Sequence, residues 1–425
     1  MRIVKYESES QIKKMYTSSE EGTDQILLNV REIISKVKQD GDFALLHYTE
    51  KFDGTKLDEL RVSEKEIEKA YENCDKYFIE TLEIAAENIR KFHAHQLNNN
   101  FVLTGDGGTV MGQRYTPIEK VGVYVPGGTA PYPSTVLMDV VPAKIAGVSK
   151  IVMVTPPLKD GSVNGSILAA AKVAGVDEIY KIGGAQAVAA LSYGTETVPQ
   201  VDKIVGPGNI YVATAKQLVF GQVDIDMIAG PSDILIISDK TGNPKHLAAD
   251  LLSQAEHDVL ATSTLVVTDE NLAKKVSDEV ERQLQKLPRQ EIARTSIDNN
   301  GYIIVVENLD DAVEVGNIIA PEHLEIATDD PFALLDSVKN AGSIFLGKYT
   351  PEALGDYFAG PNHTLPTNGT ARFSSPLSVD DFVKKSSFIY YTESQLDKVK
   401  DRVMNFARHE NLEAHAQAIN KRFED

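Results

Sequence analysis

Gln254 and His257 are spaced so that they could share one ligand. The apolar periodicity of residues 246–258 predicts a helix, and side chains three positions apart lie on one face of a helix. Glutamine offers a carbonyl oxygen and histidine an imidazole nitrogen, so the two side chains could bind one metal ion. The other interpretation of this pair is a helix end that carries solvated polar residues.

Glu322 and His323 are adjacent and follow a proline, which predicts a loop-to-helix transition at this point. Neighbouring residues on a helix point in different directions, so these two are poorly suited to one metal ion. They could instead act as two proton acceptors that line one cleft. A helix cap with an acidic first turn explains the pair equally well.

Two further carboxylate and histidine pairs lie in the C-terminal part of the chain. Asp356 and His363 fall in a stretch rich in glycine and proline, which is typical of a shaped surface loop. Glu410 and His415 follow in a polar helical tail, about 140° apart on a straight helix, so they share a face only if the helix bends. Glutamine, aspartate and two histidines would suit Zn²⁺ or Mn²⁺, between which the sequence does not choose.

The single cysteine, Cys74, is predicted to be structural. It continues the apolar stripe of a predicted helix, where cysteine behaves as a small hydrophobic residue. The stripe consists of Ile67, Ala70, Tyr71, Cys74 and Phe78. No neighbouring group would activate Cys74 as a thiolate, so we do not expect it to be a nucleophile.

Three glycine-rich loops could bind a phosphate group. They span residues 124–128, 183–186 and 206–209, and each ends a β-branched run and opens a helical pattern. Glycine lets the backbone approach a phosphate, and the helix N-terminus supplies N–H donors. Each loop carries one polar side chain at its mouth: Tyr124, Gln186 or Asn209. None completes the G-x-G-x-x-G fingerprint, so tight turns between strand and helix remain the alternative to a dinucleotide site.

The elements that must position these residues alternate from about residue 120. Eight short β-branched runs, mostly separated by helical patterns, span residues 121–125, 150–154, 178–182, 202–205, 233–237, 263–267, 302–306 and 343–346. This alternation predicts an α/β fold with largely parallel sheets. The first hundred residues look helical instead, because apolar residues recur there at helical spacing.

Composition and charge exclude several classes of protein. The 425 residues carry a formal net charge of −19, which disfavours nucleic-acid binding. No apolar run approaches the roughly 20 residues of a membrane span, and the charged start does not resemble a signal peptide. One cysteine rules out a disulfide framework within the chain. We therefore expect a cytoplasmic protein.

Taken together, the spaced motifs resemble those of histidinol dehydrogenase. The resemblance keeps its order over nearly the whole chain. Its motifs are VGVYVPGG (121–128), IGGAQAVAAL (182–191), VGPGN (205–209), AGPSD (229–233), QAEHD (254–258), APEHLEI (320–326), GDYFAGPNHTLPT (355–367) and EAHA (413–416). Two positions depart from the family pattern: Asp233 stands where we expect glutamate, and Asp258 where a small residue is commoner.

The resemblance implies a fold of two Rossmann-like parallel-sheet domains, with an aldehyde dehydrogenase-like architecture. The implied parts are an N-terminal helical segment (1–20), a discontinuous main domain with metal and catalytic residues (21–123 and 232–377), an inserted NAD-binding domain (124–231), and a C-terminal helical arm (378–425). The family is a homodimer in which this arm reaches the partner's site. Glu410 and His415 would then act in trans.

The resemblance also implies the reaction, which is oxidation of L-histidinol to L-histidine by two NAD through a bound aldehyde. By position, the ligands of one Zn²⁺ per subunit, for which Mn²⁺ could substitute, are Gln254, His257, Asp356 and His415. The substrate contacts are these four residues together with Ser232, His323, His363 and Glu410. The cofactor contacts are Tyr124, Gln186 and Asn209. His323 would accept the alcohol proton, Glu322 with His323 would activate water, and zinc would orient the substrate.

Three alternatives give different expectations. A relative that oxidises another primary alcohol should differ at His363, Glu410 and His415, which would read the substrate. A zinc hydrolase with Glu322 as its base leaves the glycine loops without a role. A non-catalytic scaffold predicts neither metal binding nor turnover.

Overall fold

The computed structural model describes residues 1–16, 23–127 and 131–424. The chain divides into two compact units. The first comprises Met1–Gln96 and Ile118–Phe382, and the second comprises Leu97–Pro117 and Val383–Asp425. Across the described residues, no helix is long and apolar enough to cross a membrane.

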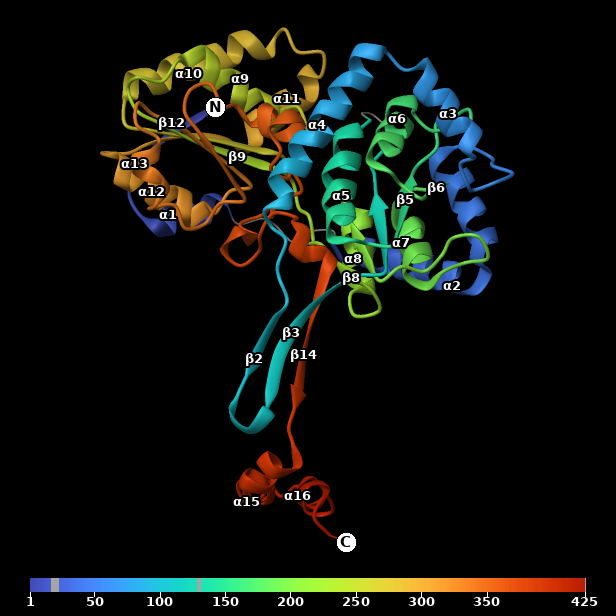
Figure 1. Ribbon diagram of the computed structural model, residues 1–425. Helices are drawn as coiled ribbons and strands as arrows, with labels where there is room; N and C mark the ends of the chain where they lie inside the picture. The colour runs from blue at the N-terminus through green and yellow to red at the C-terminus, as the bar shows by residue number, and fades with distance from the viewer. Residues whose placement is uncertain (17–22, 128–130, 425) are drawn as a thin grey trace. The chain divides into compact units, whose positions relative to one another are not determined.

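The first unit contains a five-stranded parallel sheet in the order β6-β5-β4-β7-β8, of which Figure 1 labels β5, β6 and β8. Its strands are β4 (Lys120–Tyr124), β5 (Lys150–Thr155), β6 (Glu178–Lys181), β7 (Lys203–Val205) and β8 (Asp224–Ile225). Helices α2 (Thr23–Asp53), α7 (Gly184–Tyr193) and α8 (Ile210–Val219) share one apolar cluster with one face of this sheet. Helices α5 (Pro133–Ala146) and α6 (Gly165–Ala174) pack together on the other side, so the central strands are buried on both faces.

The same unit contains a six-stranded parallel sheet in the order β1-β11-β10-β9-β12-β13. Its strands are β1 (Arg2–Lys5), β9 (Asp233–Ser238), β10 (Thr262–Val267), β11 (Gly301–Val305), β12 (His323–Ala327) and β13 (Ser343–Leu346). Helices α9 (Pro244–Ala255), α10 (Glu270–Leu284) and α11 (Gln290–Asn300) pack on one face. Helices α1 (Glu9–Met15), α12 (Leu309–Ile319) and α13 (Phe332–Leu335) cover the other face.

These sheets confirm the predicted α/β fold with parallel sheets, and all eight expected runs form strands. The loop-to-helix transition predicted at Glu322 and His323 is wrong, because His323 begins strand β12. Leu324 and Ile326 alternate with His323 and Glu325, all of them buried, and the strand pairs with β9 and β13 on its two sides. The short alternating segment looked helical because the proline before it suggested a helix start.

The stripe that contained Cys74 is also not one helix. Helix α3 (Glu64–Asn73) ends at Cys74, which is its C-cap, and α4 (Lys76–Ala94) begins after its own N-cap, Asp75. Cys74 is half-buried at this junction and does not lie on a continuous apolar face. The prediction that it packs as a core residue of a helix is therefore wrong.

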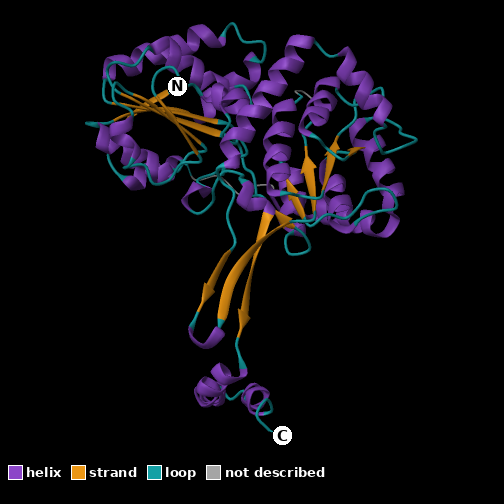
Figure 2. Cartoon of the chain, viewed as in Figure 1, coloured by secondary structure: helices purple, strands orange, loops and turns teal. Residues whose placement is uncertain are grey.

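The second unit has an antiparallel sheet in the order β14-β3-β2, built from β2 (Phe101–Thr104), β3 (Val110–Pro117) and β14 (Val383–Tyr390). Helices α15 (Glu393–His409) and α16 (Glu413–Asn420) follow and pack against each other. Figure 2 shows these strands in orange and the two C-terminal helices in purple. The C-terminal arm thus opens with a strand before its helices, as the N-terminal segment opens with β1 before α1.

Candidate functional site

His323 lies at the amino end of β12, buried beside β9. Its Nδ1 lies 3.1 Å from the backbone oxygen of Asp233, which can only accept, so Nδ1 carries a proton and Nε2 is the nitrogen that can exchange one. Nε2 has no hydrogen-bond partner and lies 3.6 Å from Asp356 Oδ1 and 4.0 Å from Glu352 Oε1. This nitrogen is placed to accept a proton.

The charges around His323 favour its protonated form. Burial by itself lowers the pKa of the imidazole, but Glu352, Glu322 and Asp356 outweigh burial and raise this pKa well above its ordinary value. The carboxylates therefore stabilise the imidazolium that forms when His323 accepts a proton.

Glu322 and Asp233 hold each other through two hydrogen bonds. The Glu322 backbone N donates to Asp233 Oδ1 at 2.9 Å, and the Asp233 backbone N donates to Glu322 Oε2 at 3.1 Å. Burial raises the pKa of Glu322 to about 8 and that of Asp233 to about 6. Asp233, although shorter than the glutamate expected at this position, thus still links the amino ends of β9 and β12 through hydrogen bonds. A glutamate whose pKa lies near neutrality is suited to acid–base chemistry.

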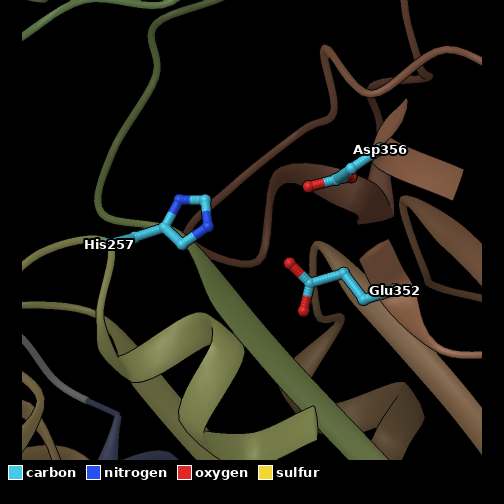
Figure 3. Close-up of side chains that lie close together, drawn as sticks. All are labelled: His257, Glu352 and Asp356. Carbon is cyan, nitrogen blue, oxygen red and sulfur yellow. The ribbon is translucent and has the colours of Figure 1, made fainter. Parts of the chain in front are cut away.

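His257, Glu352 and Asp356 form a cluster whose ligand atoms all lie within 4.8 Å of one another. Figure 3 shows the imidazole of His257 facing the two carboxylates. Helix α9 runs back along the sheet after β9, so its C-terminal end reaches the amino ends of the strands. Gln254 is fully buried in its last turn, whereas His257 follows the helix in a turn. The prediction that both side chains lie on one helix face is therefore wrong. Both residues nevertheless lie at the C-terminal end of α9.

Glu352 was missed in the sequence, yet it links the cluster to Gln254. With its amide nitrogen turned toward Glu352, Gln254 donates to the two carboxylate oxygens at 3.0 and 3.2 Å. The backbone N of Glu352 donates to Glu325 Oε1 at 2.8 Å, at the start of the short helix α14 (Glu352–Leu354). A carboxylate four residues before Asp356 was the available signal, because residues at this spacing share a helix face.

Asp356 belongs to a π-helical turn, η2 (Gly355–Ala359). Burial raises the pKa of its carboxyl group, but the contact with His323 prevails and the net shift is downward. The backbone oxygen of Asp356 accepts from His363 Nδ1 at 3.0 Å, and His363 Nε2 lies 3.2 Å from Thr135 Oγ1. Ser232, half-buried, immediately precedes Asp233. These predicted substrate contacts surround the same strand ends.

The other two predicted contacts, Glu410 and His415, belong to the second unit. Glu410 is the C-cap of α15, and His415 lies in the first turn of α16. Both side chains are exposed. The donors that the first unit brings together are therefore Gln254, His257, Glu352 and Asp356. Imidazole nitrogen with carboxylate and amide oxygen is a donor set that fits zinc.

Tyr124, Gln186 and Asn209 line one cavity of about 520 Å³ at the carboxyl ends of β4, β6 and β7. The Tyr124 hydroxyl accepts from the backbone N of Gly184 at 3.0 Å, and Asn209 caps α8. Gln186 is buried, and its Oε1 has no hydrogen-bond partner. Gly128, at the end of the first glycine loop, lies outside the described residues.

Two doubly wound parallel sheets, one of which carries a buried histidine among carboxylates, define an α/β protein with an enzyme-like site. A sequence profile of histidinol dehydrogenase matches residues 16–423. The chain therefore belongs to the histidinol dehydrogenase family, oxidoreductases of histidine biosynthesis that act on an alcohol and aldehyde.

Individual relatives support this assignment. The chain is 59% identical to histidinol dehydrogenase of Clostridium acetobutylicum over 399 residues, which cover 94% of this chain and 93% of that protein. It is 57% identical to a Bacillus cereus histidinol dehydrogenase, with 99% and 97% covered. The crystal structure of the Elizabethkingia anophelis enzyme superposes with a TM-score of 0.93 at 40% identity, covering 99% and 98% of the two chains.

Proposed function

We propose that this chain oxidises L-histidinol to L-histidine in two successive steps, with two NAD and one Zn²⁺ per subunit. The observation that carries the proposal is His323, whose free Nε2 is buried between Asp356 and Glu352 beside His257. A base next to a set of metal donors is what alcohol oxidation on an oriented substrate needs.

In the first oxidation, His323 Nε2 accepts the proton of the substrate hydroxyl group. Tyr124, Gln186 and Asn209 would hold NAD, which would supply the hydride acceptor for the same carbon, so the products would be an aldehyde, NADH and a proton. The carboxylates of Glu352, Glu322 and Asp356 stabilise the imidazolium that results. Nδ1 stays fixed on the Asp233 carbonyl, which keeps the ring oriented throughout.

In the second oxidation, Glu322 and His323 remove a proton from water as it adds to the aldehyde. The hydrate would then give a hydroxyl proton to His323 and a second hydride to another bound NAD, which would yield the carboxylic acid, NADH and a proton. Glu322 can serve because its pKa of about 8 lets it hold or release a proton near neutral pH. Cys74 is not needed as a nucleophile, in keeping with its place at a helix end.

Gln254, His257 and Asp356 would hold zinc, together with His415 from the partner's arm. Zinc at this site would orient the imidazole and amine of the substrate. Glu352 would fix the Gln254 amide so that its oxygen remains for the metal. Ser232, His363 and Glu410 would complete the substrate contacts, and Tyr124, Gln186 and Asn209 those of NAD.

The shared arm requires a homodimer, and the second unit supports one. Its sheet and helices expose large apolar side chains: Phe101, Val102, Leu103, Met111, Ile389, Tyr390 and Phe406. Clustered exposed apolar residues are typical of protein interfaces. We also propose a cytoplasmic location, which suits a chain with one cysteine.

The test is the NADH yield from limiting L-histidinol and excess NAD, before and after chelation and zinc return. We expect two NADH per histidinol, lost with the chelator and restored by zinc. One NADH per histidinol would contradict the water-activating role of Glu322. No NADH from folded, zinc-loaded protein would overturn the proposed function.

A further inference from the structure

Helix α2 forms part of the wall of the cavity that Tyr124, Gln186 and Asn209 line. This helix precedes the three glycine loops in the sequence. Its C-terminal part contributes Lys51, Phe52 and Asp53, and an earlier turn contributes Glu32. No motif in the sequence connects α2 with a cofactor. Its side chains nevertheless make up much of one wall of this cavity.

Asp53, the last residue of α2, presents an unsatisfied acceptor. Its Oδ2 is buried and has no hydrogen-bond partner. Burial raises the pKa of Asp53 to about 6, so the side chain is a carboxylate at neutral pH. Its charge acts on Tyr124, whose pKa is raised to about 12 by burial and, to a smaller extent, by Asp53. A buried carboxylate oxygen without a donor favours a ligand that supplies hydroxyl groups.

A second unpartnered acceptor lies in the same cavity. Gln186 is 1% exposed, and its Oε1 has no partner either. Two independent buried acceptors that line one cavity of about 520 Å³ indicate a ligand rich in hydroxyl and N–H donors.

Within the described part of the five-stranded sheet, no acidic side chain directly follows the second strand. In dinucleotide-binding folds, an acidic side chain that follows the second strand binds the 2′-hydroxyl of the adenosine ribose. Here the second strand, β5, ends at Thr155 and is followed by Pro156 and Pro157. Pro156 fills this corner so closely that a Cβ on Gly127 or Gly183 would lie 2.8 or 2.7 Å from it. A carboxylate for the ribose must therefore come from another element.

The charges in the cavity suit a diol better than an additional phosphate. Asp53 and Glu32 are the acidic side chains that line it, and Lys51 is the ammonium group. Lys51 is exposed, with Nζ 5.3 Å from the ring centre of Phe52. It can meet a phosphate near solvent, whereas the buried oxygen of Asp53 would repel one.

We propose that Asp53, assisted by Glu32, makes this enzyme select NAD over NADP. The Asp53 carboxylate accepts hydrogen bonds from the ribose hydroxyls of NAD and repels the 2′-phosphate of NADP. This proposal rests on the proposed function, in which the cavity binds the dinucleotide.

The experiment compares wild type with Asp53→Asn, measuring kcat and KM for NAD and for NADP at saturating histidinol. We expect the KM for NAD to rise about 10-fold and the ratio of kcat/KM for NADP to that for NAD to rise about 10- to 100-fold. We expect kcat at saturating NAD to change little, because Asp53 does not contact the reacting atoms. Glu50→Gln is the matched control, since this exposed carboxylate lies on α2 but does not line the cavity. Its coenzyme ratio should stay that of wild type.

An unchanged coenzyme ratio in folded Asp53→Asn would overturn the proposal. If this variant does not fold, Glu32→Gln supplies the test, with a smaller shift in the same direction expected and no shift overturning it. Calorimetric titration with NAD and NADP measures the same preference without turnover. If the wild type binds NAD in preference to NADP but oxidises no histidinol, the proposed function fails while the inference stands.

Discussion

The two parallel sheets of the first unit place their candidate sites at opposite ends of their strands. In the five-stranded sheet, the cavity lies at the carboxyl ends of β4, β6 and β7. In the six-stranded sheet, Asp233 and His323 are the first residues of β9 and β12, so that site lies at the amino ends. Apart from the edge strand β1, each sheet begins at a central strand, β4 or β9, and extends to either side of it. A similar strand order therefore does not determine at which end of the strands the candidate site lies.

The difference follows from the helix ends that each edge presents. At the carboxyl ends of parallel strands, helices begin, and their free N–H groups attract phosphate. At the amino ends, helices finish, and the carbonyl end of a helix attracts cations. Helix α9 ends beside Gln254 and His257 at this edge. One edge thus suits a dinucleotide and the other suits a metal ion with an imidazole base.

The largest expected effect separates the two edges by function. His323→Ala should lower kcat about 10²- to 10⁴-fold, because it removes the proposed base. Calorimetry should show NAD affinity within about two-fold of wild type, since the cavity lies on the other sheet. His246→Ala, an exposed histidine on the same helix as Gln254, is the control and should leave kcat unchanged. Loss of NAD binding in His323→Ala would contradict the separation of the two sites.

A second prediction tests the metal edge. Glu352→Gln should weaken zinc binding about 10- to 100-fold, because it removes the carboxylate that orients Gln254 and lies beside His257. Competition with a chelator measures the affinity. Glu256→Gln changes a carboxylate next to His257 that is outside the cluster, and it should retain wild-type affinity. Equal zinc affinities in the two variants would show that Glu352 does not support the site.

A third prediction tests the carboxyl ends of the five-stranded sheet, where the glycine loops lie. Gly206 has a φ of 110°, and an added Cβ would lie 2.1 Å from the backbone oxygen of Tyr124. Gly206→Ala should therefore destabilise the fold by about 1–3 kcal/mol or more and raise the KM for NAD. Gly221→Ala has a similar φ of 97° with no atom within 4 Å, so it isolates the backbone strain from the clash. Chemical denaturation and NAD titration should rank Gly206→Ala as the worse of the two.

The smallest expected effect concerns Asp139, which lies between Thr364, next to His363, and Gly206, in the third glycine loop. This buried residue of α5 accepts from Thr364 Oγ1 at 2.9 Å, next to His363, and its Oδ2 lies 3.1 Å from where a Cβ on Gly206 would be. Burial, with the nearby charge of Asp226, raises the pKa of Asp139 to about 8. The folded state therefore favours the protonated carboxyl group.

A carboxyl group with a raised pKa in the folded state contributes its full stability below its unfolded pKa of about 4. This contribution is lost as the pH rises toward 8. Between pH 6 and 8.5 the Tm of wild type should thus fall. The Tm of Asp139→Asn should fall by about 2–4 °C less over the same range. Calorimetric scans across this range measure the difference. Parallel pH dependence in the two proteins would show that Asp139 does not titrate as described.

Much of the fold could be predicted from local patterns. The β-branched runs around VGVYV and DILII are long enough, and their flanking turns clear enough, to identify strands without tertiary information. Strand β12 could not be identified in this way, because HLEIA owes its extended form to its neighbours β9 and β13. The same limit applies to Cys74, where one periodic stretch divides into two helices at a cap.

The sequence by itself determined which residue types are available and in what order: the glycine loops, Gln254 and His257 at a helix end, and the motif around Asp356. Only the tertiary structure decided that Glu352 joins His257 and Asp356, that His323 opens a strand with Nε2 unpartnered, and that Asp53 faces the cavity of Tyr124. The physical reason is that local patterns depend on residues within a few positions. Apart from Glu352 and Asp356, which are neighbours on one turn, these contacts join residues about 30 to more than 90 positions apart, brought together by the packing of helices against the sheets.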